Sequence, residues 1–177
     1  MHIFAIVALL AGATWAFRRG WNSAREDVFD TALNTDLVTL PDAIMSSLNW
    51  TYFYGSGSPS TPWSEGGAGV DCSGYAQMVL VKLGKLLSTA TDRGALDLAN
   101  ASNPVAVGSQ TVGDMAYYPG HVVIVASEPG KDGHSMVIGA RGNPWDFGNN
   151  PDSKVKLYSS ALYRSDFSTY MRLKSNA

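Results

Sequence analysis

Hydrophobic side chains recur at helical spacing in the first half of the chain and in short continuous runs in the second half. In the first half, this spacing predicts helices over residues 20–35, 41–48 and 72–84. Pro41 suits the start of its helix, because proline lacks an N–H that the first turn would leave unpaired. Gly84 suits a helix end.

The second half of the chain has the pattern of a sheet. Short apolar or β-branched runs, separated by turn residues such as those at 129–133, predict strands over residues 115–118, 121–126, 135–140, 155–158 and 169–173. Helices followed by strands, without alternation, indicate an α+β fold in which an antiparallel meander packs against the helix that begins at Cys72.

Residues 55–69 read GSGSPSTPWSEGGAG and separate the helix of residues 41–48 from the one that begins at Cys72. Gly, Ser and Pro at this density predict a loop, with Trp63 as its one large apolar side chain. A rim that selects substrate and a solvated insertion are both compatible with this composition.

The chain begins with an apolar segment. Residues 3–17 carry no charge and are followed by Arg18 and Arg19. As a helix these fifteen residues would rise about 22 Å, and a helix that spans a bilayer usually needs roughly 20 residues. We therefore consider a membrane anchor, a cleaved signal and a helix buried in an assembly, and favour a retained segment. Residues 1–40 form the anchor or docking part, with residues 1–33 as the contact to a membrane or partner, and residues 41–177 form the catalytic domain.

Composition narrows the class of protein. With 177 residues, 45% of them apolar, the chain fits one ordinary domain beyond its N-terminal segment. A net charge of −2 without a basic run argues against a nucleic-acid partner. A single cysteine excludes an internal disulfide and a zinc–thiolate cluster. The sequence has no GxSxG, phosphate-loop or HExxH motif, so we expect no metal and no cofactor.

The only cysteine, Cys72, lies at the start of a predicted helix, and His121 opens a predicted strand. Backbone N–H groups and the helix dipole at such a position favour a thiolate, so we expect a lowered pKa for Cys72. A thiol and an imidazole from distant segments suggest a cysteine hydrolase. The alternatives are a buried, inert thiol and a structural histidine.

Four segments together resemble the successive signatures of NlpC-type cell-wall cysteine peptidases: YFYG at 52–55, DCSGY at 71–75, VGDM at 112–115 and GHVVI at 120–124. The resemblance covers about residues 41–173. It implies a papain-like α+β core that hydrolyses amide bonds in peptidoglycan stem peptides, commonly next to D-glutamate.

The resemblance also assigns roles to residues. It implies that Cys72 is the nucleophile, that His121 is the base, and that Tyr52 helps to form the oxyanion site. Asp71 and Ser73 match a pocket for a free amine of the substrate. From the residues alone, packing on the core is the alternative for Tyr52, and a helix N-cap is an equal alternative for Asp71. Asp114 suits a turn better than a substrate contact.

The third catalytic position departs from the family, in which a polar residue on the next strand orients the histidine. If residues 129–133 form the turn, Ser127 faces His134 and His121 faces about Ala140, so His134 lies roughly 20 Å from His121 along the sheet. Aligning the apolar strand instead puts Gly139 in the third position. We therefore rank a backbone carbonyl or a Cys–His dyad first, Asn143 second and His134 last.

These features predict a peptidoglycan endopeptidase that works outside the cytoplasm, either membrane-anchored, secreted or carried by a phage virion. A cysteine amidase or acyltransferase on the same fold is the nearest alternative. A non-catalytic component of a phage tail or envelope assembly is an alternative of another class, supported by the apolar N-terminus.

Overall fold

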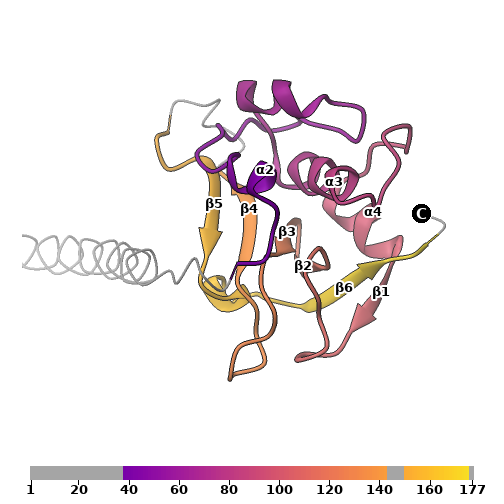
Figure 1. Cartoon of the computed structure of the whole chain (residues 1–177), viewed down its shortest axis with the longest axis vertical. Helices are drawn as coiled ribbons and strands as arrows, with labels where there is room; N and C mark the ends of the chain where they lie inside the picture. The colour runs from indigo at the N-terminus through magenta and orange to yellow at the C-terminus, as the bar shows by residue number, and fades with distance from the viewer. Residues whose placement is uncertain (1–37, 143–149, 176–177) are drawn as a thin grey trace, which may run out of the picture. The chain divides into compact units, whose positions relative to one another are not determined.

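The computed structural model describes residues 38–142 and 150–175, which form a mixed α-helical and antiparallel β structure (Figure 1). The predicted α+β class is confirmed. The α-helices described are α2 (Asp42–Met45), α3 (Cys72–Lys82) and α4 (Ala95–Asn100), with 3₁₀ turns η2 (Trp63–Ala68) and η3 (Ala161–Tyr163). The apolar segment and the helix predicted for residues 20–35 lie outside the described residues. Within the described ranges, no helix has the length and apolar character needed to cross a membrane.

One six-stranded sheet forms the centre of the described part. Its strands are β1 (Ser102–Val105), β2 (Met115–Tyr118), β3 (His121–Val125), β4 (Val137–Arg141), β5 (Lys154–Tyr158) and β6 (Thr169–Leu173). The order across the sheet is β1-β6-β2-β3-β4-β5, and every pairing is antiparallel. The predicted meander is therefore present from β2 to β5, and β6 returns to lie between β1 and β2.

All five predicted strands are found, but strand β1 and helix α4 were not predicted. Strand β1 has the sequence SNPV, with Pro104 in its interior. Proline is tolerated there because β1 lies at the edge of the sheet, where an N–H on the outer side needs no partner. Helix α4 covers only six residues, too few for a clear helical pattern.

The register of the central hairpin differs by one residue from our prediction. Ile124 pairs with Ile138 and Val125 with Val137, so continuing the count places His121 opposite Arg141, not Ala140. The predicted register was wrong because the turn between β3 and β4 is longer than five residues. It uses the Ser127 hydroxyl as an acceptor for the Met136 N–H.

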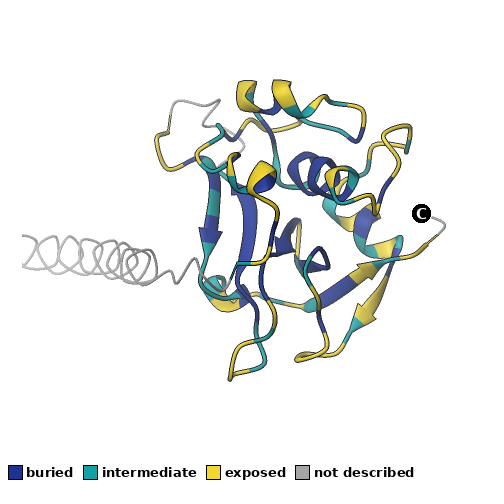
Figure 2. Ribbon diagram, in the orientation of Figure 1, coloured by how far each residue is buried: buried dark blue, intermediate teal, exposed yellow. Residues whose placement is uncertain are grey.

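Helix α3 has defined signals at both ends. Asp71 caps its start by accepting a hydrogen bond from the Gly74 backbone N–H. At its end, Gly84 has φ +68°, and the N–H groups of Gly84 and Lys85 donate to the carbonyls of Val81 and Leu80. This is the Schellman arrangement, in which glycine tolerates the left-handed conformation. Residues 74–80 are all buried, and α3 packs against β3 and β4 (Figure 2).

The segment predicted as a loop is only partly irregular. Within residues 55–69, η2 forms a helical turn, and the ring of Trp63 lies 4.7 Å from that of Trp50. Gly66 permits this packing, since a Cβ there would lie 2.0 Å from the Trp50 ring. The prediction of a loop without regular structure was wrong for residues 63–68, because tertiary packing outweighs the weak local preference of glycine.

A cluster of buried side chains covers one face of the sheet. Its members come from β2, β3, β4, β6 and η3, and we call it the η3-side cluster: Ala116, Tyr118, Val123, Val125, Val137, Ala161 and Tyr170. Partly buried Tyr158, Tyr163 and Phe167 pack against it. Side chains alternate along a strand, so His121 shares this face with Val123 and Val125.

Candidate active site

The thiol of Cys72 lies where the start of α3 meets the start of β3. Cys72 is the first residue of α3 and is half-buried. Three backbone N–H groups are directed at its sulfur, from Cys72 itself, from Ser73 and from Val122. Because Val122 directly follows His121, this contact brings the start of β3, where His121 lies, next to Cys72.

The charge state of the thiol differs from our expectation. Burial raises the pKa of Cys72, the negative charge of Asp71 raises it further, and the three backbone N–H groups lower it only in part. The net pKa is above the ordinary value. The predicted lowering of the pKa was therefore wrong, because removal from water and a neighbouring carboxylate outweigh the helix N-terminus.

His121 is the first residue of β3 and follows the two-residue turn at Pro119 and Gly120. Its side chain is 7% exposed, and its Nε2 lies 2.8 Å from the hydroxyl of Tyr163. The ring also packs 5.7 Å from that of Tyr118. Burial, together with the positive charges of Arg164 and Arg141, lowers the pKa of His121 to about 3.

The resting pair is therefore neutral. Both residues belong to the described part, and no hydrogen bond joins the sulfur of Cys72 to a ring nitrogen of His121 in this state. Nε2 is hydrogen-bonded to Tyr163, and Nδ1 has no hydrogen-bond partner among the described residues. A neutral imidazole can act as a general base toward a neutral thiol, and catalytic hydrogen bonds often tighten only when substrate binds.

Asp71 and Ser73, the predicted pocket for a substrate amine, are bonded to each other and to the chain. Oδ1 of Asp71 accepts hydrogen bonds from the Gly74 N–H at 2.7 Å and the Ser73 hydroxyl at 3.0 Å. Oδ2 accepts from the Gly55 N–H at 2.9 Å. The structure thus shows Asp71 as the N-cap of α3, which was the alternative interpretation from the sequence.

Gly74 lets the loop before α3 approach the helix. A Cβ at Gly74 would lie 2.3 Å from the Ser56 carbonyl oxygen and 2.6 Å from that of Gly57. The same Ser56 carbonyl accepts a hydrogen bond from the Asp71 N–H at 2.8 Å. The glycine of the DCSG segment therefore fixes the backbone around the thiol.

Tyr52, the predicted oxyanion residue, is 6% exposed and lies on a short bridge to Val70. Its ring packs against the backbone of Gly142, where a Cβ would lie 2.3 Å from the ring. This contact joins the end of β4 to the segment that leads to Cys72. Tyr52 is thus placed as a packed aromatic side chain beside the cysteine segment.

Of the ranked side chains for the third position, His134 makes no hydrogen bond to His121 in the described structure. Asn143 lies outside the described residues. His134 lies in the turn between β3 and β4, where its Nδ1 is 3.2 Å from the Tyr170 hydroxyl. At Gly139, a Cβ would lie 2.3 Å from Cγ1 of Val123, so the position has no room for a side chain.

Among the described residues, the side chain that hydrogen-bonds His121 is Tyr163, which was not predicted from the sequence. Tyr163 lies in η3, 42 positions after His121, and not on the adjacent strand where an orienting residue was sought. The residues ALY of η3 are a short apolar pattern that the sequence shows before Arg164. This pattern does not identify Tyr163 as a partner of His121, because a hydrogen bond between distant segments leaves no periodic pattern.

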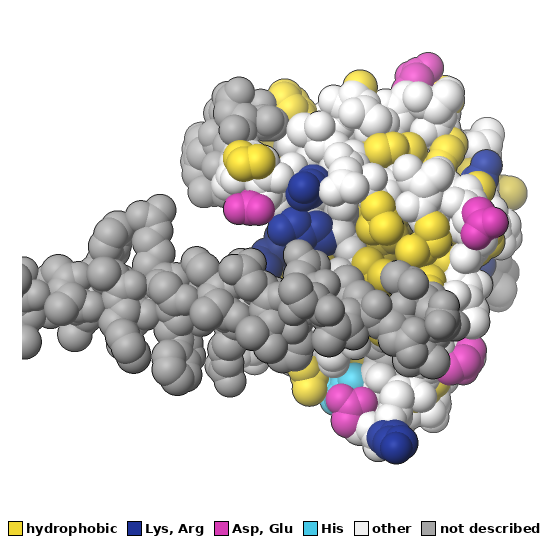
Figure 3. Space-filling model, turned by 60° about the vertical axis from the view of Figure 1, so that its left-hand side comes forward, with side chains coloured by type: hydrophobic (Ala, Val, Ile, Leu, Met, Phe, Trp, Pro, Cys, Tyr) yellow, Lys and Arg dark blue, Asp and Glu magenta, His cyan; other side chains and the backbone are white. Residues whose placement is uncertain are grey.

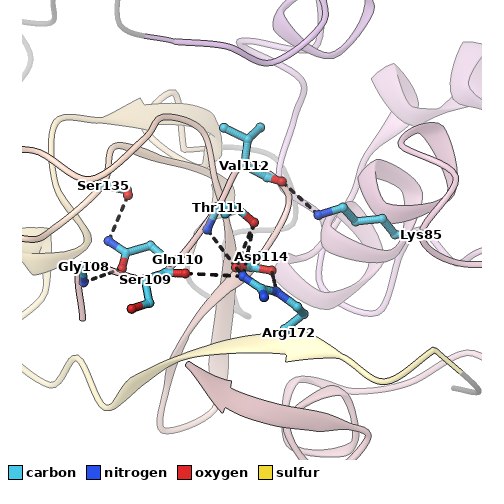
Figure 4. A network of polar contacts seen from close by, with 9 residues as sticks. All are labelled: Lys85, Gly108, Ser109, Gln110, Thr111, Val112, Asp114, Ser135 and Arg172. Atoms are coloured by element: carbon cyan, nitrogen blue, oxygen red, sulfur yellow. Dashed lines mark hydrogen bonds and ion pairs between the residues drawn. The ribbon is translucent and has the colours of Figure 1, made fainter. Parts of the chain in front are cut away.

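Asp114, predicted to fix a turn, does so at the start of β2. Its carboxylate accepts from the Thr111 N–H at 2.8 Å and from two nitrogens of Arg172 at 2.9 and 2.7 Å (Figure 4). Lys85 bonds the Val112 carbonyl, which links the end of α3 to the same turn. Burial alone would raise the pKa of Asp114, but hydrogen bonds from Arg172 and Thr111 and the nearby positive charges lower it overall.

Within the described ranges, no three His, Cys, Asp or Glu side chains lie close enough together to hold a metal ion. One face of the molecule gathers hydrophobic side chains beside a group of Lys and Arg side chains (Figure 3).

No family model matches the chain, and no curated protein matches it either.

Proposed function

We propose that this chain is a cysteine peptidase with a papain-like core of NlpC type, acting outside the cytoplasm on amide bonds in peptidoglycan stem peptides. The observation that carries the proposal is the convergence of the Cys72, Ser73 and Val122 backbone N–H groups on the Cys72 sulfur, one residue from His121. The substrate class is carried by the resemblance of residues 52–55, 71–75, 112–115 and 120–124 to that family.

In the proposed reaction, His121 removes the proton of the Cys72 thiol as the sulfur attacks the amide carbonyl. Because both groups are neutral at rest, proton transfer and attack occur together. Backbone N–H groups at the start of α3 stabilise the negative oxygen of the tetrahedral intermediate. The imidazolium then protonates the leaving amine, and water hydrolyses the thioester with His121 again as base.

The test is digestion of purified peptidoglycan by the full chain and by Cys72→Ala, followed by mass spectrometry of the soluble products. We expect stem-peptide fragments from the wild-type chain alone, and their masses identify the bond. Loss of the whole stem from the glycan would indicate an amidase, and new cross-links would indicate an acyltransferase. No release by either chain, across several wall types, would favour a structural or binding component.

A further inference from the structure

We infer that Tyr163 is the positioning residue of the active site, whose hydroxyl holds the His121 ring through Nε2 so that Nδ1 is the nitrogen that serves Cys72. This inference rests on the proposed function and names a group that performs the orienting role from η3. The hydroxyl of Tyr163 lies 2.8 Å from Nε2 of His121. That separation is typical of a hydrogen bond between a hydroxyl and a ring nitrogen.

Tyr163 is held firmly enough to orient another ring. Its ring stacks on that of Tyr158 at 3.9 Å, with 12° between the planes, and meets the edge of Tyr118 at 5.5 Å. Arg141 lies 5.8 Å from the centre of the same ring. Contacts on several sides fix the position of the hydroxyl, and an orienting group acts only if its own position is fixed.

The turn that carries Tyr163 is itself tied to the sheet. The Ala161 N–H donates to the Ser135 carbonyl at 3.0 Å, and the Tyr118 hydroxyl donates to the Ala161 carbonyl at 2.6 Å. Ser160 caps the turn by accepting from the Leu162 N–H. The position of the Tyr163 hydroxyl is thus determined by Tyr118, on β2 next to His121, and by Ser135, which precedes β4.

The proposed role requires one tautomer of His121, the one in which Nε2 donates to the Tyr163 hydroxyl. A neutral imidazole carries one proton, so only one nitrogen is free to act as a base. If Nδ1 receives the thiol proton, Nε2 must carry its own hydrogen and donate it to the Tyr163 oxygen. After transfer, the imidazolium keeps this Nε2 bond while Nδ1 holds the proton from sulfur. The step thus moves one proton from the sulfur to Nδ1, and the Tyr163 phenol stays neutral.

The strand position where the family places an orienting side chain is closed in this chain. Gly139 faces Val123 without room for a Cβ, and Arg141, opposite His121, lies over the Tyr163 ring. The charged groups that act on His121 are Arg141, Arg164 and Asp166, and Arg164 is paired with Asp166 at 2.6 Å. Tyr163 is therefore the neutral group that reaches Nε2.

The test compares Tyr163→Phe with the wild-type chain by long-range ¹H–¹⁵N NMR of the histidine rings, with His121→Gln to assign the His121 signals. Phenylalanine keeps the ring packing and removes only the hydroxyl. We expect the Nε2–H tautomer in the wild type and a shift toward a mixture in Tyr163→Phe. With a stem-peptide substrate, kcat should fall about tenfold or more while KM changes less than about twofold.

Tyr170→Phe is the matched control, because it removes a tyrosine hydroxyl from His134 on the same face of the sheet. It should leave the His121 tautomer and kcat unchanged. The inference is overturned by an Nδ1–H tautomer in the wild type, or by Tyr163→Phe leaving tautomer or kcat as they were. If Tyr163→Phe fails to fold, the His121 tautomer of the wild-type chain alone tests the inference, and an Nδ1–H tautomer overturns it. If the wild type cleaves no wall peptide, the proposed function fails, and the NMR result still tests the contact.

Discussion

The backbone N–H of Val122, the residue that follows His121, is directed at the sulfur of Cys72 and lowers the pKa of the thiol. This contact joins the first turn of α3 to the first residues of β3, two segments far apart in the sequence. It places the thiol beside the strand backbone, while the His121 ring extends to Tyr163. The geometry of the proposed catalytic pair therefore depends on how α3 packs against β3, and that packing gives testable predictions.

The raised pKa of Cys72 predicts slow alkylation at neutral pH. We expect the rate of reaction with iodoacetamide to rise with pH, with a midpoint above that of a free cysteine, because burial and Asp71 disfavour the thiolate. The measurement is the alkylation rate of the native chain between pH 5 and 10. Reaction faster than that of free cysteine at pH 6 would show a preformed thiolate and contradict this account.

Asp71→Asn tests the second cause of that shift. Asparagine still caps α3 through its amide oxygen but carries no charge, so the pKa of Cys72 should fall and alkylation at pH 7 should become faster. Asp97→Asn on α4 removes a carboxylate in the first turn of another helix and serves as the control. Equal rates in the wild type and Asp71→Asn would remove Asp71 from the explanation.

Buried His121 predicts a loss of stability in acid. Its pKa is about 3 in the folded chain, against about 6.5 in an unfolded one, so between these values the unfolded state binds a proton that the folded state does not. The stabilising contribution is complete above pH 6.5 and declines as pH falls toward 3.

His121→Gln isolates this effect, since glutamine cannot titrate. Between pH 6.5 and 4.5 the wild type should lose about 2 to 3 kcal/mol of unfolding free energy relative to His121→Gln. Urea unfolding at both pH values gives the difference. The same pH dependence in both chains would mean that His121 is charged or accessible in the folded state.

Arg172 stabilises the buried carboxylate of Asp114. Removing it in Arg172→Met should cost about 1 to 3 kcal/mol at pH 7, because Asp114, only 1% exposed, keeps a charge without its main partner. The pKa of Asp114 is lowered in the folded chain, so its stabilising effect is present above the unfolded pKa and is lost as pH falls. The cost of Arg172→Met should therefore shrink in acid.

Adding Asp114→Asn to Arg172→Met should recover part of the loss, since no unpaired charge remains. Lys156→Met removes an ion pair whose carboxylate, Asp152, is exposed, and should change stability by less than about 0.5 kcal/mol. An Arg172→Met chain as stable as Lys156→Met would show that water replaces the arginine.

Gly139 cannot be replaced without moving β3. In Gly139→Ala, the new Cβ would meet Cγ1 of Val123 at 2.3 Å, and we expect a loss of about 1 to 3 kcal/mol. Combining it with Val123→Ala should cost less than the sum of the single changes, which a double-mutant cycle of thermal or urea unfolding measures. Gly94→Ala, where the nearest atom lies 3.8 Å away, is the control. Additive effects would show that the two positions do not touch.

Much of the fold could be predicted from the sequence, because its core elements carry strong local signals. Strands β2 and β3 are short, largely apolar runs, and α3 has both a capping aspartate and a glycine after its last turn. Strand β1 could not be predicted, since its polar residues and Pro104 are acceptable only at a sheet edge. Helix η2 depends on the packing of Trp63 against Trp50, which no local pattern encodes.

The candidate site was predicted less completely. Cys72 and His121 are recognisable from neighbouring residues, and the structure brings their segments together. The sign of the Cys72 pKa shift was missed because burial is a property of the folded chain. Tyr163 could not be predicted, because the family resemblance points to the strand next to His121, whereas the hydroxyl comes from a turn 42 positions later.

The central claim is that Cys72 attacks an amide carbonyl, and trapping the resulting thioester tests it most directly. Acid-quenched mixtures of the full chain and a stem peptide, examined by intact-mass and peptide mapping, should show the acyl part of the substrate attached to the peptide that contains Cys72. Cys72→Ala should show no adduct and release no product. Product release by Cys72→Ala at the wild-type rate, with no adduct on the wild type, would contradict the account.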